Sequence, residues 1–130
     1  MGENKQQTKA KYKIVMPKFY TISKQAKGHV YIVRVDNFIK IGSTKSPKNR
    51  LEKYKMFPPF KYDVLLLEEV EDRVFYERSL QTMLIKFQIQ GEWFEMPNWE
   101  SPKKQAKDLL KYIKRQVLLQ LKTKPPIYGK

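Results

Sequence analysis

Residues 28–51 of the chain read GHVYIVRVDNFIKIGSTKSPKNRL, and this stretch decides the fold. It contains two short runs of β-branched and aromatic residues, at positions 30–35 and 38–41. Asp36 and Asn37 separate the runs, and this pair tolerates the positive φ of a tight turn. The sequence therefore predicts a β-hairpin in the first third of the chain.

The second run ends in Gly42, and we expect a Ser/Thr/Pro loop to lead from there into a helix over residues 47–57. Ser46 suits the cap of that helix and Pro47 its first position. Hairpin and helix together bring three polar side chains onto one small unit: Tyr31, Lys40 and Arg50. A phenol, an ammonium and a guanidinium at this spacing favour a site for a phosphate.

The elements that follow predict a small α/β (α+β) domain with three strands and three helices. Residues 62–70 form an apolar run without clean alternation, which is typical of a strand buried between layers. Asp72 caps a predicted helix over residues 73–88, and residues 92–97 are predicted as a short strand or an ordered loop. Ser101 and Pro102 begin a last helix that runs to about residue 121.

Positive charge is concentrated at the two ends of the chain. The formal net charge is +14, yet residues 28–100 contain equal numbers of basic and acidic side chains. A neutral core with basic flanks suits the backbone of a nucleic acid, because bound lysines displace condensed counterions. Two alternatives stay open: the lysines only keep the ends in solution, or they bind an anionic membrane surface.

These patterns divide the chain into four segments. Residues 1–27 form a basic, partly disordered segment and residues 28–100 the core. Residues 101–121 form a basic amphipathic helix that packs on the core, and residues 122–130 form a tail. We predict that lysines of the loop and of this helix contact nucleic acid: Lys45, Lys48, Lys103, Lys107, Lys111 and Lys114.

Composition excludes several kinds of site. The 130 residues, 41% of them hydrophobic, suffice for one modest domain. Without cysteine and with one histidine, the chain offers no disulfide and no thiolate or histidine cluster for a metal. No apolar run approaches the roughly 18 residues that span a bilayer, and no signal peptide is recognisable. We expect a soluble intracellular protein of the cytoplasm or nucleus without a membrane partner.

The ordered set of Gly28-His29-Val30-Tyr31, Lys40-Ile41-Gly42, Arg50 and Glu77 resembles the GIY-YIG nuclease superfamily. The chain is most similar to the phage and restriction-enzyme branch, where Lys-Ile-Gly often forms the second signature and a late Glu-Trp-Phe element appears. The resemblance covers roughly residues 28–96. It implies a three-stranded antiparallel sheet flanked by helices, in a metal-dependent endonuclease that hydrolyses phosphodiester bonds in DNA. It also allows for a homodimer.

The resemblance implies a catalytic role for each matching residue. Tyr31 deprotonates or orients the attacking water, and Lys40, in place of the second signature tyrosine, supplies the charge that favours a phenolate. Arg50 stabilises charge on the phosphate oxygens. Tyr54 matches the place of a His or Tyr near the nucleophile. Glu77 holds one Mg²⁺ or Mn²⁺, since a hard cation prefers carboxylate oxygens.

Structural interpretations stand beside these roles. Lys40 can be a solvent-facing strand lysine, Tyr54 a core residue, and Glu77 a partner of Arg73 or Arg50 in an ion pair. The family's late asparagine has no counterpart at the matching spacing. The alternative function is a non-catalytic nucleic-acid-binding module on the same fold. A third is a basic protein that assembles with partners through residues 101–121.

Overall fold

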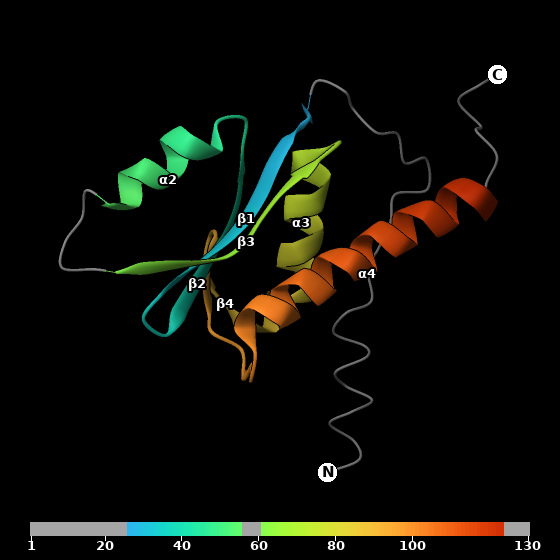
Figure 1. Ribbon diagram of the computed structural model, residues 1–130. Coiled ribbons are helices and arrows are strands. Elements are labelled where there is room, and N and C mark those ends of the chain that lie inside the picture. Colours follow the sequence, from blue (N-terminus) through green and yellow to red (C-terminus); the bar gives the residue numbers. More distant parts are fainter. Residues whose placement is uncertain (1–25, 56–60, 124–130) are drawn as a thin grey trace, which may run out of the picture.

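The computed structural model describes residues 26–55 and 61–123, with the side chains of residues 26–51 and 61–120. Five strands form one sheet in the order β3-β1-β2-β5-β4, with helices on both of its faces (Figure 1). The elements are β1 (Gly28–Val35), β2 (Phe38–Thr44), α2 (Pro47–Lys55), β3 (Tyr62–Val70), α3 (Arg73–Met83), the 3-10 helix η2 (Ile85–Phe87), β4 (Gln88–Gln90), β5 (Trp93–Glu95) and α4 (Pro102–Thr123). The predicted N-terminal segment and tail lie almost entirely outside these residues.

The central hairpin forms where the sequence predicts it. Strands β1 and β2 pair antiparallel with Val35 opposite Phe38, so that Asp36 and Asn37 make the turn. Asp36 has a φ of 54°, the left-handed conformation that a short Asp side chain tolerates. The pair at the turn is therefore confirmed as the origin of the hairpin.

Strand β2 is longer than predicted. It continues past Gly42 to Thr44, because its last residues pair with the first half of β1: Ser43 lies opposite Val30 and Thr44 opposite His29. The prediction that the strand ends at Gly42 and gives way to a loop is wrong. The change matters for the site, since Ser43 is held in a fixed register.

The sheet has five strands, so the prediction of three was wrong. Residues predicted as a strand or loop form β5, which pairs with β2 from Phe38 to Lys40. The helix predicted over residues 73–88 is too long: α3 ends at Met83, η2 follows, and Gln88 is already the first residue of β4. After α3 the backbone hydrogen bonds change from the α-helical to the 3-10 pattern. The Phe87 N–H donates to the Leu84 carbonyl, three residues back, at 2.9 Å, and the chain leaves the helix axis.

Strand β3 lies at the edge of the sheet, which corrects the prediction of a strand buried between layers. It is antiparallel to β1, and three of its residues are buried: Leu65, Leu66 and Val70. Leu67 remains 37% exposed, so the run is apolar without being covered on both faces.

Helix starts follow the predicted caps. The carboxylate of Asp72 accepts a hydrogen bond from the Phe75 N–H at 3.1 Å and begins α3. The Ser46 carbonyl accepts from the Arg50 N–H at 3.0 Å, and Pro47 takes the first position of α2. These two starts fix the directions from which Arg50 and Glu77 approach the sheet.

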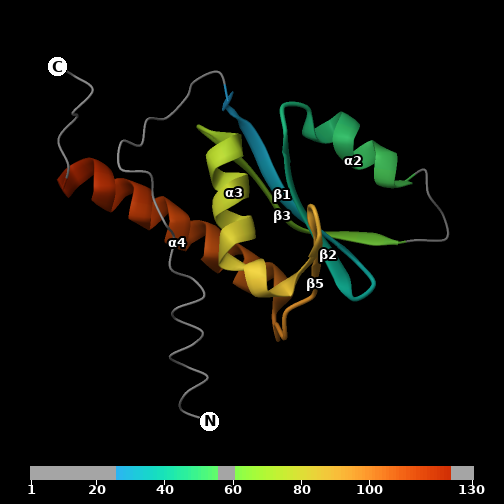
Figure 2. The same cartoon turned by 180° about the vertical axis from the view of Figure 1, so that it is seen from behind.

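Helices α3 and α4 lie on one face of the sheet and α2 on the other (Figures 1 and 2). The main hydrophobic cluster joins the sheet to α3 and α4 and includes Ile32, Ile41, Leu80 and Ile113. Along α4 the apolar stripe is buried as its spacing predicts, at Ala106, Leu109, Leu110, Ile113 and Val117. No helix in the described part of the chain is long and apolar enough to cross a membrane.

The buried Tyr76 on α3 makes stability sensitive to alkaline pH. Burial, with the nearby carboxylates of Glu71 and Asp72, raises the pKa of Tyr76 from 10.0 to about 12. The stability that its neutral phenol contributes is complete below pH 10 and disappears as pH rises through 12, because the unfolded chain gives up this proton first.

We therefore expect the Tyr76→Phe variant to lose less unfolding free energy than the wild type between about pH 9 and pH 12. The difference should be on the order of 1–2 kcal/mol, measured by urea unfolding at each pH. If the unfolding free energy of the two proteins fell equally with pH across this range, the expected role of Tyr76 would be contradicted.

Candidate active site

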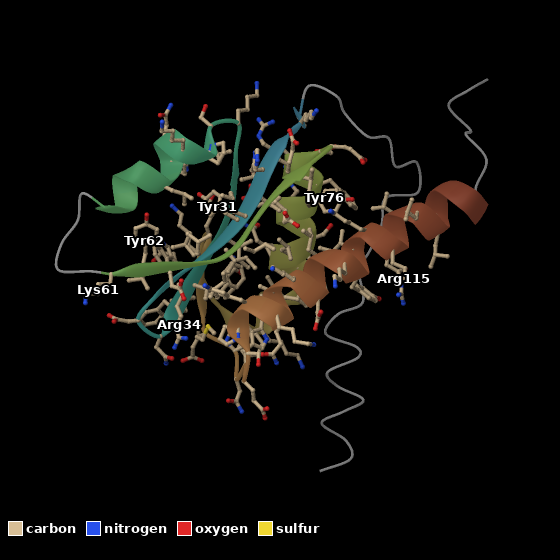
Figure 3. The ribbon with its side chains drawn as sticks, viewed as in Figure 1. Tyr31, Arg34, Lys61, Tyr62, Tyr76 and Arg115 are labelled. Carbon is tan, nitrogen blue, oxygen red and sulfur yellow. The ribbon has the colours of Figure 1, made fainter. Side chains whose placement is uncertain are left out.

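Side chains of β1 and β2 alternate between the two faces of the sheet. Tyr31 lies opposite Gly42 and Lys40 opposite Val33, so all four belong to one face. Tyr31 is fully buried yet stands apart from the cluster that packs on α3 and α4. It lies between the sheet and α2, on the face of the sheet that bears α2 (Figure 3).

The phenol of Tyr31 lies directly against the backbone of Gly42. A Cβ atom added at Gly42 would stand 2.5 Å from the phenol oxygen and 2.7 Å from Cζ. Such distances are too short for any side chain, so only glycine allows the ring to occupy this position. The glycine of the Lys-Ile-Gly motif is therefore required by the tyrosine of the first strand.

Arg50 reaches the same phenol from α2. Its Nη1 donates to the Tyr31 hydroxyl oxygen over 3.5 Å, a long hydrogen bond, and its side chain is half-buried. The arginine is placed by the start of α2, which follows β2 after two residues. A guanidinium and a phenol are thus brought together at the far end of the hairpin.

Glu77 approaches the same end of β2 from α3, on the other face of the sheet. One carboxylate oxygen accepts from the Ser43 hydroxyl at 2.5 Å, and the other accepts from the Gln81 amide at 3.0 Å. Glu77 therefore contacts β2 at Ser43, the residue that follows Gly42, and the Tyr31 ring lies against Gly42. The partners shown for Glu77 are neutral donors, in place of the ion pair with Arg73 or Arg50 considered from the sequence.

The edge of β2 explains why Glu77 can reach this point. The Ile41 N–H still donates to the Glu92 carbonyl at 3.0 Å, but the ladder between β2 and β5 extends only from Phe38 to Lys40. The Ile41 carbonyl accepts a hydrogen bond from the Gln81 amide at 3.0 Å, where a neighbouring strand would otherwise supply a backbone N–H. Within the described residues, β2 therefore has an open edge from Gly42 to Thr44, and Glu77 lies at this edge.

The donors at this edge fit a hard divalent cation. In the described part of the chain no three His, Cys, Asp or Glu side chains gather into a complete metal cage. Mg²⁺ is commonly held by one or two carboxylates, water and substrate phosphate. Glu77 supplies a carboxylate and Ser43 a hydroxyl oxygen beside it.

Lys40 shares the face of Tyr31 and contacts residues of the β4–β5 hairpin. Its Nζ is 3.7 Å from a Glu92 carboxylate oxygen and 5.9 Å from the centroid of the Trp93 ring. The cation shown at the Tyr31 hydroxyl is that of Arg50. Tyr54 belongs to α2, but its side chain lies outside the described residues.

The lysines predicted to bind nucleic acid lie in two separate places. Lys45 and Lys48 flank the start of α2 and are exposed beside Arg50. The other four, Lys103, Lys107, Lys111 and Lys114, belong to α4, which lies across the sheet from α2 (Figures 1 and 2). Lys45 and Lys48 therefore lie on the Arg50 side of the sheet, and the sheet lies between them and the lysines of α4.

For three residues near the site, Gln81, Ser43 and His29, the sequence did not predict what the structure shows. Gln81 follows Glu77 by four positions, so helical spacing alone could have paired their side chains. Ser43 was expected in a loop. His29 lies opposite Thr44 on the Tyr31 face, and its buried Nδ1 has no hydrogen-bond partner among the described residues.

Comparison with protein families gives a match to the T5orf172 domain over residues 19–115, well over half of the chain. This domain is found in phage proteins and in some endonuclease-like proteins. The match spans β1, β2, α2, α3 and most of α4, and so includes Tyr31, Arg50 and Glu77. Comparisons with curated proteins and with solved structures gave no match.

The contact between Gly42 and Tyr31 predicts a strong coupling between the two positions. Gly42→Ala should cost about 1–3 kcal/mol of unfolding free energy, because the added methyl group overlaps the ring. In a Tyr31→Ala background the same change should cost almost nothing. Urea unfolding of the four proteins in this double-mutant cycle measures the coupling, and an equal penalty in both backgrounds would refute the contact.

Proposed function

Because the chain belongs to the T5orf172 domain family, we propose that it is an endonuclease of the GIY-YIG type that hydrolyses phosphodiester bonds in DNA. The domain is compatible with a nuclease-like or nucleic-acid-binding module. One observation carries the choice of a nuclease. Arg50 of α2 contacts the Tyr31 phenol of β1, and Glu77 of α3 bonds to Ser43, the residue that follows the glycine against which this phenol lies.

Arg50 binds the phosphate in this proposal. Guanidinium has five N–H donors in a planar fork, and one of them is directed to the Tyr31 hydroxyl. The other edge of the fork suits two non-bridging phosphate oxygens, where negative charge increases during attack. The phosphate bound there lies next to the phenol.

Tyr31, in its phenolate form, orients the attacking water and accepts its proton, which leaves a neutral phenol. Its ring is held rigidly, since Gly42 lies beneath it and the side chain is fully buried. The guanidinium of Arg50 beside the phenol oxygen favours the phenolate that acts as the base. Lys40, two residues before Gly42 on the same face, adds positive charge to this surface.

Glu77 is the residue that would hold a divalent cation, with Ser43 and Gln81 fixing the direction of its carboxylate. A Mg²⁺ or Mn²⁺ ion bound there supplies charge that offsets the charge on the leaving oxygen. The carboxylate is half-buried and bonds to Ser43, one residue after Gly42 on β2.

A second candidate is a nucleic-acid-binding module without catalytic activity. The observation that favours it is the bonding of Glu77, whose two carboxylate oxygens already accept hydrogen bonds within the protein. This candidate retains the phosphate contact of Arg50 and dispenses with the cation. The two candidates differ in one measurable property, the cleavage of a phosphodiester bond.

We expect wild-type protein to nick or linearise supercoiled plasmid with Mg²⁺ or Mn²⁺ and to stop doing so with a chelator. Glu77→Gln and Arg50→Ala should each lower the rate by at least about 100-fold, the scale of losing one stabilising group at a transition state. Glu100→Gln, which changes an exposed carboxylate two residues before α4, is the matched control and should cleave like the wild type.

A gel-shift assay on the same proteins separates the two candidates. Glu77→Gln should still bind plasmid fragments, because the change preserves size and removes one negative charge. Wild-type protein that shifts DNA yet leaves it intact with every divalent metal would establish the binding module instead.

We further propose that Lys45 and Lys48 bind the DNA that is cut, while the four α4 lysines contact nucleic acid away from the cleaved bond. Charge reversal of both Lys45 and Lys48 to Glu should weaken binding more than the same change at Lys107 and Lys111. The double change at Lys45 and Lys48 should also reduce the steepness of the plot of log binding constant against log salt concentration, by about 1 for each phosphate that the protein no longer neutralises. Fluorescence anisotropy in chelator measures both; a larger effect from the α4 pair would overturn the assignment.

A further inference from the structure

An open groove of about 690 Å³ lies on the face of Tyr31, between β2 and the β4–β5 hairpin. Its walls include three large apolar side chains that remain exposed: Phe38 at 43%, Trp93 at 37% and Ile89 at 55%. Lys40 completes the wall, with its ammonium 5.9 Å from the Trp93 ring. Adjacent aromatic and aliphatic surface left open in this way is typical of a binding site.

The groove lies near the candidate active site along β2, on the same face of the sheet as Tyr31. Lys40 is in register with Trp93 on one side and stands two residues before Gly42 on the other. Two residues of a strand span about 7 Å, the scale of a single nucleotide. If the phosphate of a DNA strand lies at Arg50, the base of the neighbouring nucleotide is therefore at the mouth of the groove.

The charges of the groove favour a base over the sugar-phosphate backbone. Among the residues that line it, Glu92 pairs with Lys40 at 3.7 Å. One carboxylate that offsets one lysine leaves no net positive charge to attract a polyanion. The carboxylate accepts hydrogen bonds, however, and so complements the amino groups on the edges of cytosine and adenine. An indole ring supplies the stacking surface, which suits any base.

We propose that this groove holds an unstacked nucleobase next to the cleaved phosphate, so that the preferred substrate has unpaired nucleotides at the cut site. The inference rests on the proposed function, since it places the base relative to the phosphate at Arg50. Trp93 stacks on the base, and Phe38 and Ile89 exclude water from its edges. A continuous duplex, whose bases are already stacked, does not fill the groove.

The test compares two labelled DNA duplexes with single-stranded overhangs, one with all its bases and one with abasic overhang positions. Binding is measured by anisotropy in chelator, where cleavage is not required. Wild-type protein should bind the complete overhang about 10- to 100-fold more tightly than the abasic one. Trp93→Leu should remove this preference, Trp93→Phe should retain part of it, and Ile85→Ala, an exposed apolar control outside the groove, should keep it all.

Unfolding midpoints for each variant show that the comparison concerns folded protein. Equal affinity of the wild type for the two overhangs, or a preference that survives Trp93→Leu, would overturn the inference. So would a dimer in sedimentation velocity that Trp93→Leu converts to a monomer, because the groove would then be an interface between copies. Cleavage without base preference removes this inference alone, whereas base preference without cleavage removes the nuclease alone.

Discussion

A Cβ atom at Gly42 would stand 2.5 Å from the Tyr31 phenol oxygen, so ring and strand occupy their places only with glycine there. This contact locks two neighbouring strands of the hairpin in register and buries the tyrosine completely. With the ring fixed, the short connection to α2 brings Arg50 within 3.5 Å of the phenol oxygen. The end of the site at which we propose that phosphate binds thus depends on one close approach between a ring and a backbone.

The position of Glu77 depends on the point at which the pairing of β2 with β5 ends. The Ile41 carbonyl bonds to the Gln81 side chain, and the same amide orients Glu77. Glu77 comes from the core face and Tyr31 from the opposite face, and their contacts with β2 fall on the adjacent residues Ser43 and Gly42. Among the described residues, the edge of β2 beyond β5 is open at this point. The proposed mechanism therefore depends on β5 ending where it does.

Local signals in the sequence predicted what is locally determined. The Asp36-Asn37 turn and the helix starts at Pro47 and Asp72 depend on a few adjacent residues. The β4–β5 hairpin could not be predicted, because residues 88–90 are exposed and pair only through β5. The residue set of the site was predicted from a resemblance, but the neutral partners of Glu77 and the placement of Lys40 against Trp93 require tertiary packing. Charge along the chain likewise could not show that Lys45 and Lys111 belong to elements on opposite faces of the sheet.

The most direct measurement is a crystal structure of the protein with Mn²⁺ and a DNA oligonucleotide, with the ion located by its anomalous scattering. The account predicts an anomalous peak at the Glu77 carboxylate and a phosphate between it and Arg50, beside the Tyr31 hydroxyl. A phosphate bound on the lysines of α4 with no density at Arg50, or an ion bound away from Glu77, would contradict it.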